Sequence, residues 1–118
     1  MDDERINPEE WTIRINGVDV DFDDADCIVR ANGDVLRFEY GKIKVGHVHC
    51  PETGEVMMYP FRRMLVGDVC MMNVICRRPG PMLSAAYRHA SYHGWKISVE
   101  TIKGNGFVPD HVLVHRIK

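Results

Sequence analysis

Two Asn-Gly dipeptides, each lying between two segments that alternate apolar and polar residues, constrain the fold of this chain more than any other feature. The first joins residues 11–15 to 18–22, and the second joins residues 27–30 to 35–40. Asn-Gly accommodates the positive backbone angles of a tight hairpin turn, and alternation with a period of two is typical of a strand. The sequence therefore predicts two successive β-hairpins.

A third hairpin is predicted directly after these two. Residues 43–50 form another alternating run, and the polar loop 51–55 separates it from residues 56–59. Gly46 is expected to mark a bulge, because one extra residue there places the apolar side chains before and after it on one side of the strand. The first half of the chain is thus predicted to be an antiparallel meander of hairpins.

One amphipathic helix is predicted in the second half, over residues 82–93. Pro81 suits the first turn, where a missing N–H costs nothing, and Gly94 suits the left-handed position after the last turn. Trp95 is expected to fold back on that turn and to join the core. The apolar stripe of this helix, spaced i, i+3, i+4 and i+7, consists of Leu83, Ala86, Tyr87 and Ala90.

Further strands are predicted around this helix, over residues 69–76, 95–102 and 111–117. With 118 residues, the chain is long enough for one packed core. We therefore predict a single α+β domain over residues 11–118, an antiparallel sheet of five to eight strands with the helix packed on one face. Residues 1–10 are polar and are expected to fray.

The cysteines and the hydropathy pattern indicate a cytoplasmic protein. The cysteines are scattered with no Cys-x-x-Cys pair, and their apolar neighbours favour reduced thiols in the core. No apolar run reaches the roughly 18 residues of a membrane helix, and the acidic N-terminus does not resemble a signal peptide. We therefore expect no membrane partner. The cysteines are Cys27, Cys50, Cys70 and Cys76.

Charge is divided unequally between the two halves of the chain. Residues 1–59 contain 14 acidic and 6 basic residues, whereas residues 60–118 contain 3 acidic and 9 basic residues. The formal net charge of −2 therefore hides one half with a charge of −8 and another with a charge of +6. Such a division favours a surface that contacts another macromolecule.

Basic residues gather around the predicted start of the helix. Arg77 and Arg78 precede its N-terminus, where free backbone N–H groups and the helix dipole attract anions. Arg88 and His89 are expected on the outward helix face, and Tyr92 offers a ring on which bases can stack. Simple solvation of the arginine pair is an equally good interpretation. The candidate nucleic-acid-binding residues are Arg62, Arg63, Arg77, Arg78, Arg88 and Lys96.

The acidic run of the first half has three interpretations. A calcium loop starting at Asp19 needs glycine at its sixth position and glutamate at its twelfth, where the chain has Asp24 and Arg30. The favoured interpretation is a strand with its aspartates turned to solvent, followed by an acidic loop. The third is a patch that imitates nucleic-acid phosphates and binds a protein. Its candidate partner-binding residues are Asp19, Asp21, Asp23, Asp24 and Asp26.

Neither a metal site nor a catalytic site is predicted. His47 and His49 share a strand face, but Cys50 points the other way and no fourth ligand has a conventional spacing. Solvent-facing histidines are therefore the preferred interpretation. The chain has no nucleophile elbow, phosphate-binding loop, dinucleotide-binding fingerprint or zinc-protease motif. We expect no enzyme activity, no catalytic residue and no cofactor.

Residues 60–68, Pro-Phe-Arg-Arg-Met-Leu-Val-Gly-Asp, and the Ala-rich helix ending at Gly94 carry a resemblance. The layout over about residues 59–117 resembles small uncharacterised bacteriophage proteins with a Pro-Phe-x-x-Met-x-Val-Gly-Asp strand, an Ala-rich helix, a Gly-x-Lys strand and a short closing strand. Those proteins usually continue Val-Gly-Asp with Ser and an aromatic residue, where this chain has Val69 and Cys70. The resemblance implies an accessory protein in the host cytoplasm that binds host or phage machinery, and it assigns no catalytic residue.

Two functional hypotheses follow from the charge and the resemblance. The leading one is a non-enzymatic accessory protein of phage type that binds nucleic acid, or a complex that handles nucleic acid, through the basic surface at the helix N-terminus. The alternative is a protein–protein inhibitor of a host defence or nucleic-acid enzyme, similar to an anti-CRISPR protein, whose acidic half occupies a basic groove. The sequence defines no oligomeric state.

Overall fold

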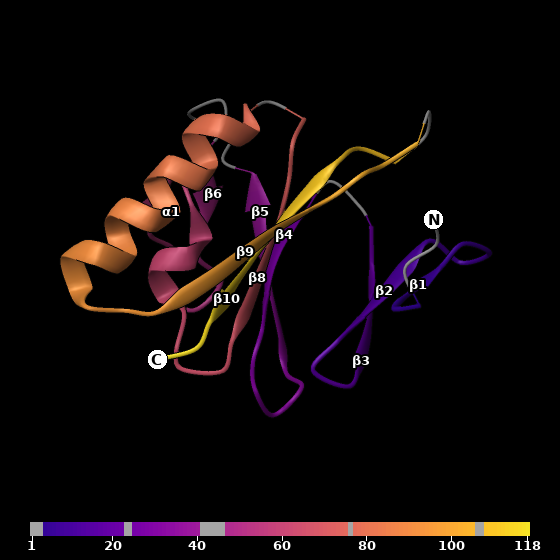
Figure 1. Ribbon diagram of the computed structural model, residues 1–118, viewed down its shortest axis with the longest axis horizontal. Helices are drawn as coiled ribbons and strands as arrows, with labels where there is room; N and C mark the ends of the chain where they lie inside the picture. The colour runs from indigo at the N-terminus through magenta and orange to yellow at the C-terminus, as the bar shows by residue number, and fades with distance from the viewer. Residues whose placement is uncertain (1–3, 23–24, 41–46, 76, 106–107) are drawn as a thin grey trace.

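The computed structural model of this protein describes residues 4–22, 25–40, 47–75, 77–105 and 108–118. Within these residues the chain forms ten strands, one α-helix and one short 3-10 helix, and the strands make two antiparallel sheets (Figure 1). The predicted α+β fold, with one helix on an antiparallel sheet, is confirmed. The sheet that carries the helix has seven strands, within the predicted range of five to eight, whereas the second sheet of three strands was not predicted.

The smaller sheet consists of β1 (Ile6–Asn7), β2 (Thr12–Ile15) and β3 (Val18–Asp21). Asn16 and Gly17 form the predicted turn between β2 and β3, with φ angles of +48° and +79°. β1 lies within the segment that was expected to fray, and its pairing with β2 ties that segment to the sheet. The side-chain amide of Asn16 lies 3.1–3.2 Å from the main-chain carbonyl oxygens of Val29, Arg30 and Gly67.

Seven strands form the larger sheet: β4 (Asp26–Val29), β5 (Val35–Tyr40), β6 (Val48–His49), β7 (Val56–Met57), β8 (Val69–Asn73), β9 (Ile97–Ile102) and β10 (His111–Arg116). Their order is β7-β6-β5-β4-β8-β10-β9, and every neighbouring pair is antiparallel. The second predicted hairpin is present as β4–β5, and the third as the short pair β6–β7. Residues 43–46 of the third hairpin's predicted first strand lie outside the described residues. The strands predicted in the second half are present as β8, β9 and β10, each somewhat shorter than predicted.

The α-helix, α1 (Pro79–His93), begins three residues earlier than predicted, because Pro79 rather than Pro81 opens its first turn. It ends as predicted at Gly94, which has a φ of +69°, and the Trp95 N–H donates to the Ala90 carbonyl at 2.8 Å. The buried face differs from the predicted stripe, since Tyr87 is exposed. The buried residues of α1 are Met82, Ala86 and Ala90.

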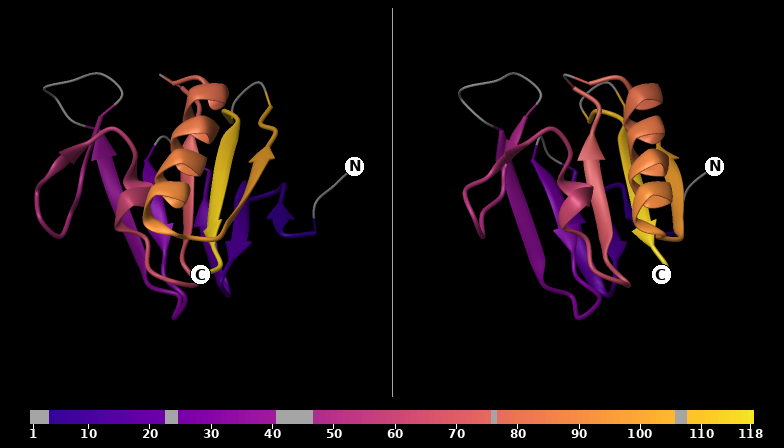
Figure 2. Two further views of the ribbon diagram at one scale, coloured as in Figure 1. Left: turned by 60° about the vertical axis from the view of Figure 1, so that its left-hand side comes forward. Right: turned by 90° about the vertical axis from the view of Figure 1, so that its left-hand side faces the viewer.

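Helix α1 and the smaller sheet cover opposite faces of the larger sheet (Figure 2). Alternation along β8 sends Cys70 and Met72 into the core beneath α1, and Val69 and Met71 into the core beneath the smaller sheet. Leu113 of β10 is fully buried in the second core. The protein therefore has three layers and two apolar cores, separated by one sheet.

Residues 60–68 do not form the strand that the resemblance implies. They form the 3-10 helix η1 (Pro60–Arg63), followed by a turn in which Gly67 has a φ of +88°. The carboxylate of Asp68 holds this turn by accepting the main-chain N–H groups of Leu65 and Ala31 at 2.7 and 3.3 Å. As a result, η1 lies beside α1 and carries Phe61 into the core beneath that helix.

Several sequence predictions concern single residues. Cys27, Cys50 and Cys70 are buried, as predicted. No helix in the described part of the chain is long and apolar enough to cross a membrane. The residues of these predictions that lie outside the described ranges are Asp23, Asp24, Gly46 and Cys76.

Candidate functional site

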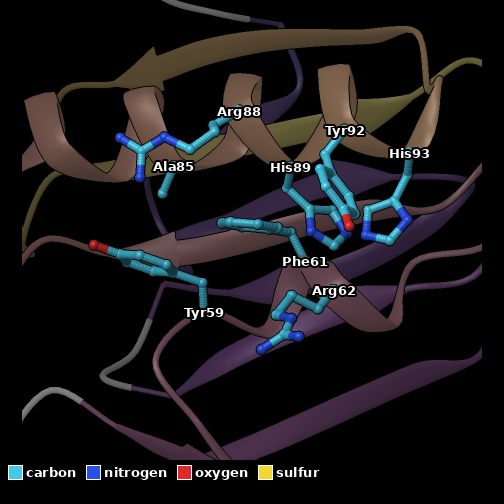
Figure 3. Close-up of a pocket in the computed structure, with 8 residues that line it drawn as sticks. All are labelled: Tyr59, Phe61, Arg62, Ala85, Arg88, His89, Tyr92 and His93. Carbon is cyan, nitrogen blue, oxygen red and sulfur yellow. The ribbon is translucent and has the colours of Figure 1, made fainter.

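A cavity of about 350 Å³ lies between α1 and η1 (Figure 3). Five of its lining residues come from α1, at positions that share one side of the helix, and the others come from η1 and the residue before it. The lining residues are Tyr59, Phe61, Arg62, Ala85, Arg88, His89, Tyr92 and His93.

Aromatic packing fixes one wall of the cavity. Phe61 is 3% exposed, and its ring stacks on that of Tyr59, with a centroid separation of 5.3 Å and an interplanar angle of 13°. Because Phe61 is anchored in the core, this stacking also orients Tyr59. On the opposite wall, Ala85 contributes only a methyl group, which leaves room for a ligand between the larger side chains.

The rim of the cavity is cationic. Arg62 and Arg88 are exposed, and no described residue forms an ion pair with either guanidinium group. By contrast, Arg14 and Arg30 each contact a carboxylate. The rim therefore holds two positive charges that the described part of the protein does not neutralise.

His89 of α1 lies beside Phe61 and His93 at the cavity (Figure 3). The centroid of its ring is 5.5 Å from that of Phe61, 4.3 Å from that of His93 and 4.7 Å from that of Trp95. Its Nε2 atom is buried and has no hydrogen-bond partner among the described residues. Burial lowers the pKa of His89 below its ordinary value, and electrostatic interactions with His93 and two arginines act in the same direction. The predicted outward position of His89 is wrong, because η1 covers it.

We expect His89 to make the protein less stable in mild acid. Because the pKa of His89 is lower in the folded state than its ordinary value of 6.5, the unfolded chain takes up this proton first. The stability that neutral His89 provides is therefore complete above about pH 6.5 and is lost as the pH falls further. When the pH falls from about 7.5 to about 5.5, the free energy of unfolding should fall less for His89→Phe than for the unchanged protein, as measured by urea unfolding. Equal losses would contradict this role.

The structure brings two of the six predicted basic residues, Arg62 and Arg88, to the cavity. Arg78 is exposed at the N-terminus of α1, and Lys96 is exposed just beyond its C-terminus. Arg63 contacts an acidic residue of the loop between β6 and β7. These three side chains do not line the cavity.

Arg77 is not on a binding surface, which corrects its assignment to the basic group. Its side chain is 5% exposed, and its guanidinium lies 2.6 Å from the carboxylate of the fully buried Asp26. The same guanidinium donates to the main-chain carbonyl of Asn73 at 3.2 Å. The sequence placed Arg77 and Asp26 on two different surfaces, whereas the pairing of β4 with β8 joins them in one buried ion pair. Neither side chain is therefore available to a macromolecular partner.

The buried pair belongs to a polar cluster at one end of the larger sheet. The main-chain N–H of Asn73 on β8 donates to the Asp26 carboxylate at 3.2 Å, and an electrostatic interaction with His111 on β10 also favours the ionised carboxylate. Burial raises the pKa of Asp26, and the hydrogen bond and charge of Arg77 oppose that rise. Because these groups are buried and come from neighbouring strands, the cluster stabilises the fold and does not form an open site.

The aspartates of β3 lie where they were predicted, whereas the histidines before β6 and in β6 do not. Asp19 and Asp21 are exposed on β3, as predicted, but Asp19 contacts Arg14 at 3.2 Å. His47 and His49 are half-buried rather than fully turned to solvent. Within the described ranges, no group of three or more His, Cys, Asp or Glu residues is placed to hold a metal ion.

Comparisons with known proteins identify no relative. No protein family matches the chain, and no curated protein or solved structure is significantly similar to it. The resemblance to phage accessory proteins stays a prediction, and the site is interpreted from its own geometry.

Four lining residues of the cavity were not predicted from the sequence. Ala85 and His93 have the helical spacing that places them beside Arg88 and Tyr92, so a helical projection could have found them. No sequence signal pointed to Tyr59 and Phe61, because residues 56–59 and 60–68 were expected to form strands. These residues reach the cavity only because η1 replaces that strand.

Proposed function

We propose that this protein binds nucleic acid through the cavity between α1 and η1. The observation that carries the proposal is the combination of two arginines, Arg62 and Arg88, with the aromatic lining of a single cavity. Guanidinium groups pair with phosphate oxygens, and aromatic rings stack on bases. Both kinds of contact help to hold a nucleic-acid strand, and this cavity offers both.

The charge around the cavity supports the same proposal. No described lining residue is acidic, and the described residues leave Arg62 and Arg88 without ion pairs. Phosphate groups can therefore approach without displacing a protein carboxylate. On this proposal the protein acts by binding and carries out no chemical step. The protein–protein alternative has weaker support, because Asp26 of its acidic surface is buried.

Removal of the two rim charges tests the proposal. We expect Arg62→Gln with Arg88→Gln to weaken binding of a fluorescent single-stranded DNA of about 12 nucleotides by at least about tenfold. The measurement is fluorescence anisotropy at low salt. Both arginines are exposed, so the fold should be unchanged.

Arg14→Gln provides a matched control for charge alone. Arg14 is 61% exposed on β2, in the sheet that covers the opposite face from α1. Its loss should change the affinity by no more than about twofold. If neither DNA nor RNA binds at low salt, the proposed function is wrong. If Arg14→Gln weakens binding as much as the removal of one rim arginine, the cavity is not the site.

A further inference from the structure

We propose that the cavity receives one unpaired base, so that the protein selects single-stranded over double-stranded nucleic acid. This inference rests on the proposed function and specifies its ligand. It follows from the size of the cavity and from the rings that line it.

The size of the cavity suits one nucleotide. Its volume of about 350 Å³ lies at the lower end of the range for small-molecule sites. In a duplex, the bases are stacked and paired, and a protein reaches only their edges in the grooves. A concave site of this size therefore accepts a base only after that base has left its stack, as in a single strand.

Two tyrosines from opposite walls supply the stacking surfaces. Tyr92, on α1, is 85% exposed, so nearly all of its ring is available to a ligand. Tyr59 precedes η1, and its ring is held by stacking on the buried Phe61. A ring that is already oriented loses little conformational entropy when a base stacks on it. Arg62 and Arg88 also line the cavity, so their guanidinium groups are the expected contacts for the phosphates beside that base.

Three fluorescent ligands of about 12 nucleotides separate base binding from phosphate binding. They are a single-stranded DNA, a blunt duplex of the same sequence, and an abasic strand that keeps every phosphate but has no bases. We expect the unchanged protein to bind the single strand roughly 5- to 150-fold more tightly than the abasic strand, the range that stacking of one base provides. It should also bind the single strand more tightly than the duplex.

A larger side chain in the cavity should abolish the preference for the single strand over the abasic strand, while the charge of the cavity stays the same. Ala85→Leu places a larger side chain in the cavity, and we expect it to reduce single-strand affinity to that for the abasic strand. Ser84→Leu adds the same side chain at the neighbouring exposed position and should leave the difference intact. Tyr92→Ala removes an exposed ring, so it serves as a second test if Ala85→Leu does not fold.

The outcomes distinguish the inference from the function on which it rests. Equal affinities of the unchanged protein for single-stranded and abasic DNA overturn base binding and leave phosphate binding intact. Tighter binding of the duplex also overturns the inference. If none of the three ligands binds at low salt, the proposed function itself fails. Loss of base preference in Ala85→Leu, with its retention in Ser84→Leu, supports the inference.

Discussion

Arg77→Leu is expected to lower the free energy of unfolding by about 3–5 kcal/mol, one of the largest effects of any single substitution in this protein. The guanidinium of Arg77 lies 2.6 Å from a carboxylate that has no exposed surface. Without it, Asp26 must stay charged in an apolar interior or take up a proton, and both cost stability. The measurement is urea unfolding followed by tryptophan fluorescence.

Two companion variants identify the cause of this loss. Adding Asp26→Asn to Arg77→Leu removes the uncompensated charge, so the double variant should be more stable than Arg77→Leu alone. Arg14→Leu breaks the exposed pair with Asp19 and should cost less than about 1 kcal/mol. A cost for Arg77→Leu as small as that of Arg14→Leu would contradict the burial of the pair.

The deficit of Arg77→Leu should shrink in acid. Burial raises the pKa of Asp26 in the folded protein above its ordinary value of 3.8, and loss of Arg77 removes a charge that opposes the rise. The folded state of the variant therefore holds the Asp26 proton to a higher pH than the unfolded chain does. Stability is then favoured at low pH and falls as the pH rises through the folded-state pKa.

Leu113→Ala should lower the free energy of unfolding by about 2–5 kcal/mol. Leu113 is fully buried between the larger sheet and the smaller sheet, so its truncation leaves a cavity in the second core. The same change at Leu65, which is 61% exposed, should stay within about 0.5 kcal/mol. Similar small costs at both positions would show that the smaller sheet does not cover this face.

Elements that depend on neighbouring residues could be predicted from the sequence. The turn at Asn16 and Gly17 and the helix end at Gly94 depend on local backbone angles, which the residue types reveal. The two cores could not be predicted in this way. β8 is apolar at nearly every position, so its pattern does not show that alternate side chains enter different layers.

The candidate site could be predicted only in part, because some of its residues come together through tertiary contacts rather than through local spacing. Arg88 was predicted from its place on the outward face of the helix, and Tyr92 was predicted as a ring on which bases can stack. The burial of Arg77 was missed, because its partner Asp26 is 51 residues away and meets it only through strand pairing. A surface arginine and a buried one have the same appearance in a sequence, and tertiary contacts decide between them.

The most direct test of nucleic-acid binding at the cavity is the salt dependence of single-strand affinity. Each phosphate contact to single-stranded nucleic acid contributes about 0.7 to the slope of the logarithm of affinity against the logarithm of salt concentration. We predict measurable binding at low salt, with a slope about 1.4 smaller in magnitude when Arg62 and Arg88 are both replaced by Gln. Absence of binding at low salt, or an unchanged slope in the double variant, would contradict this account.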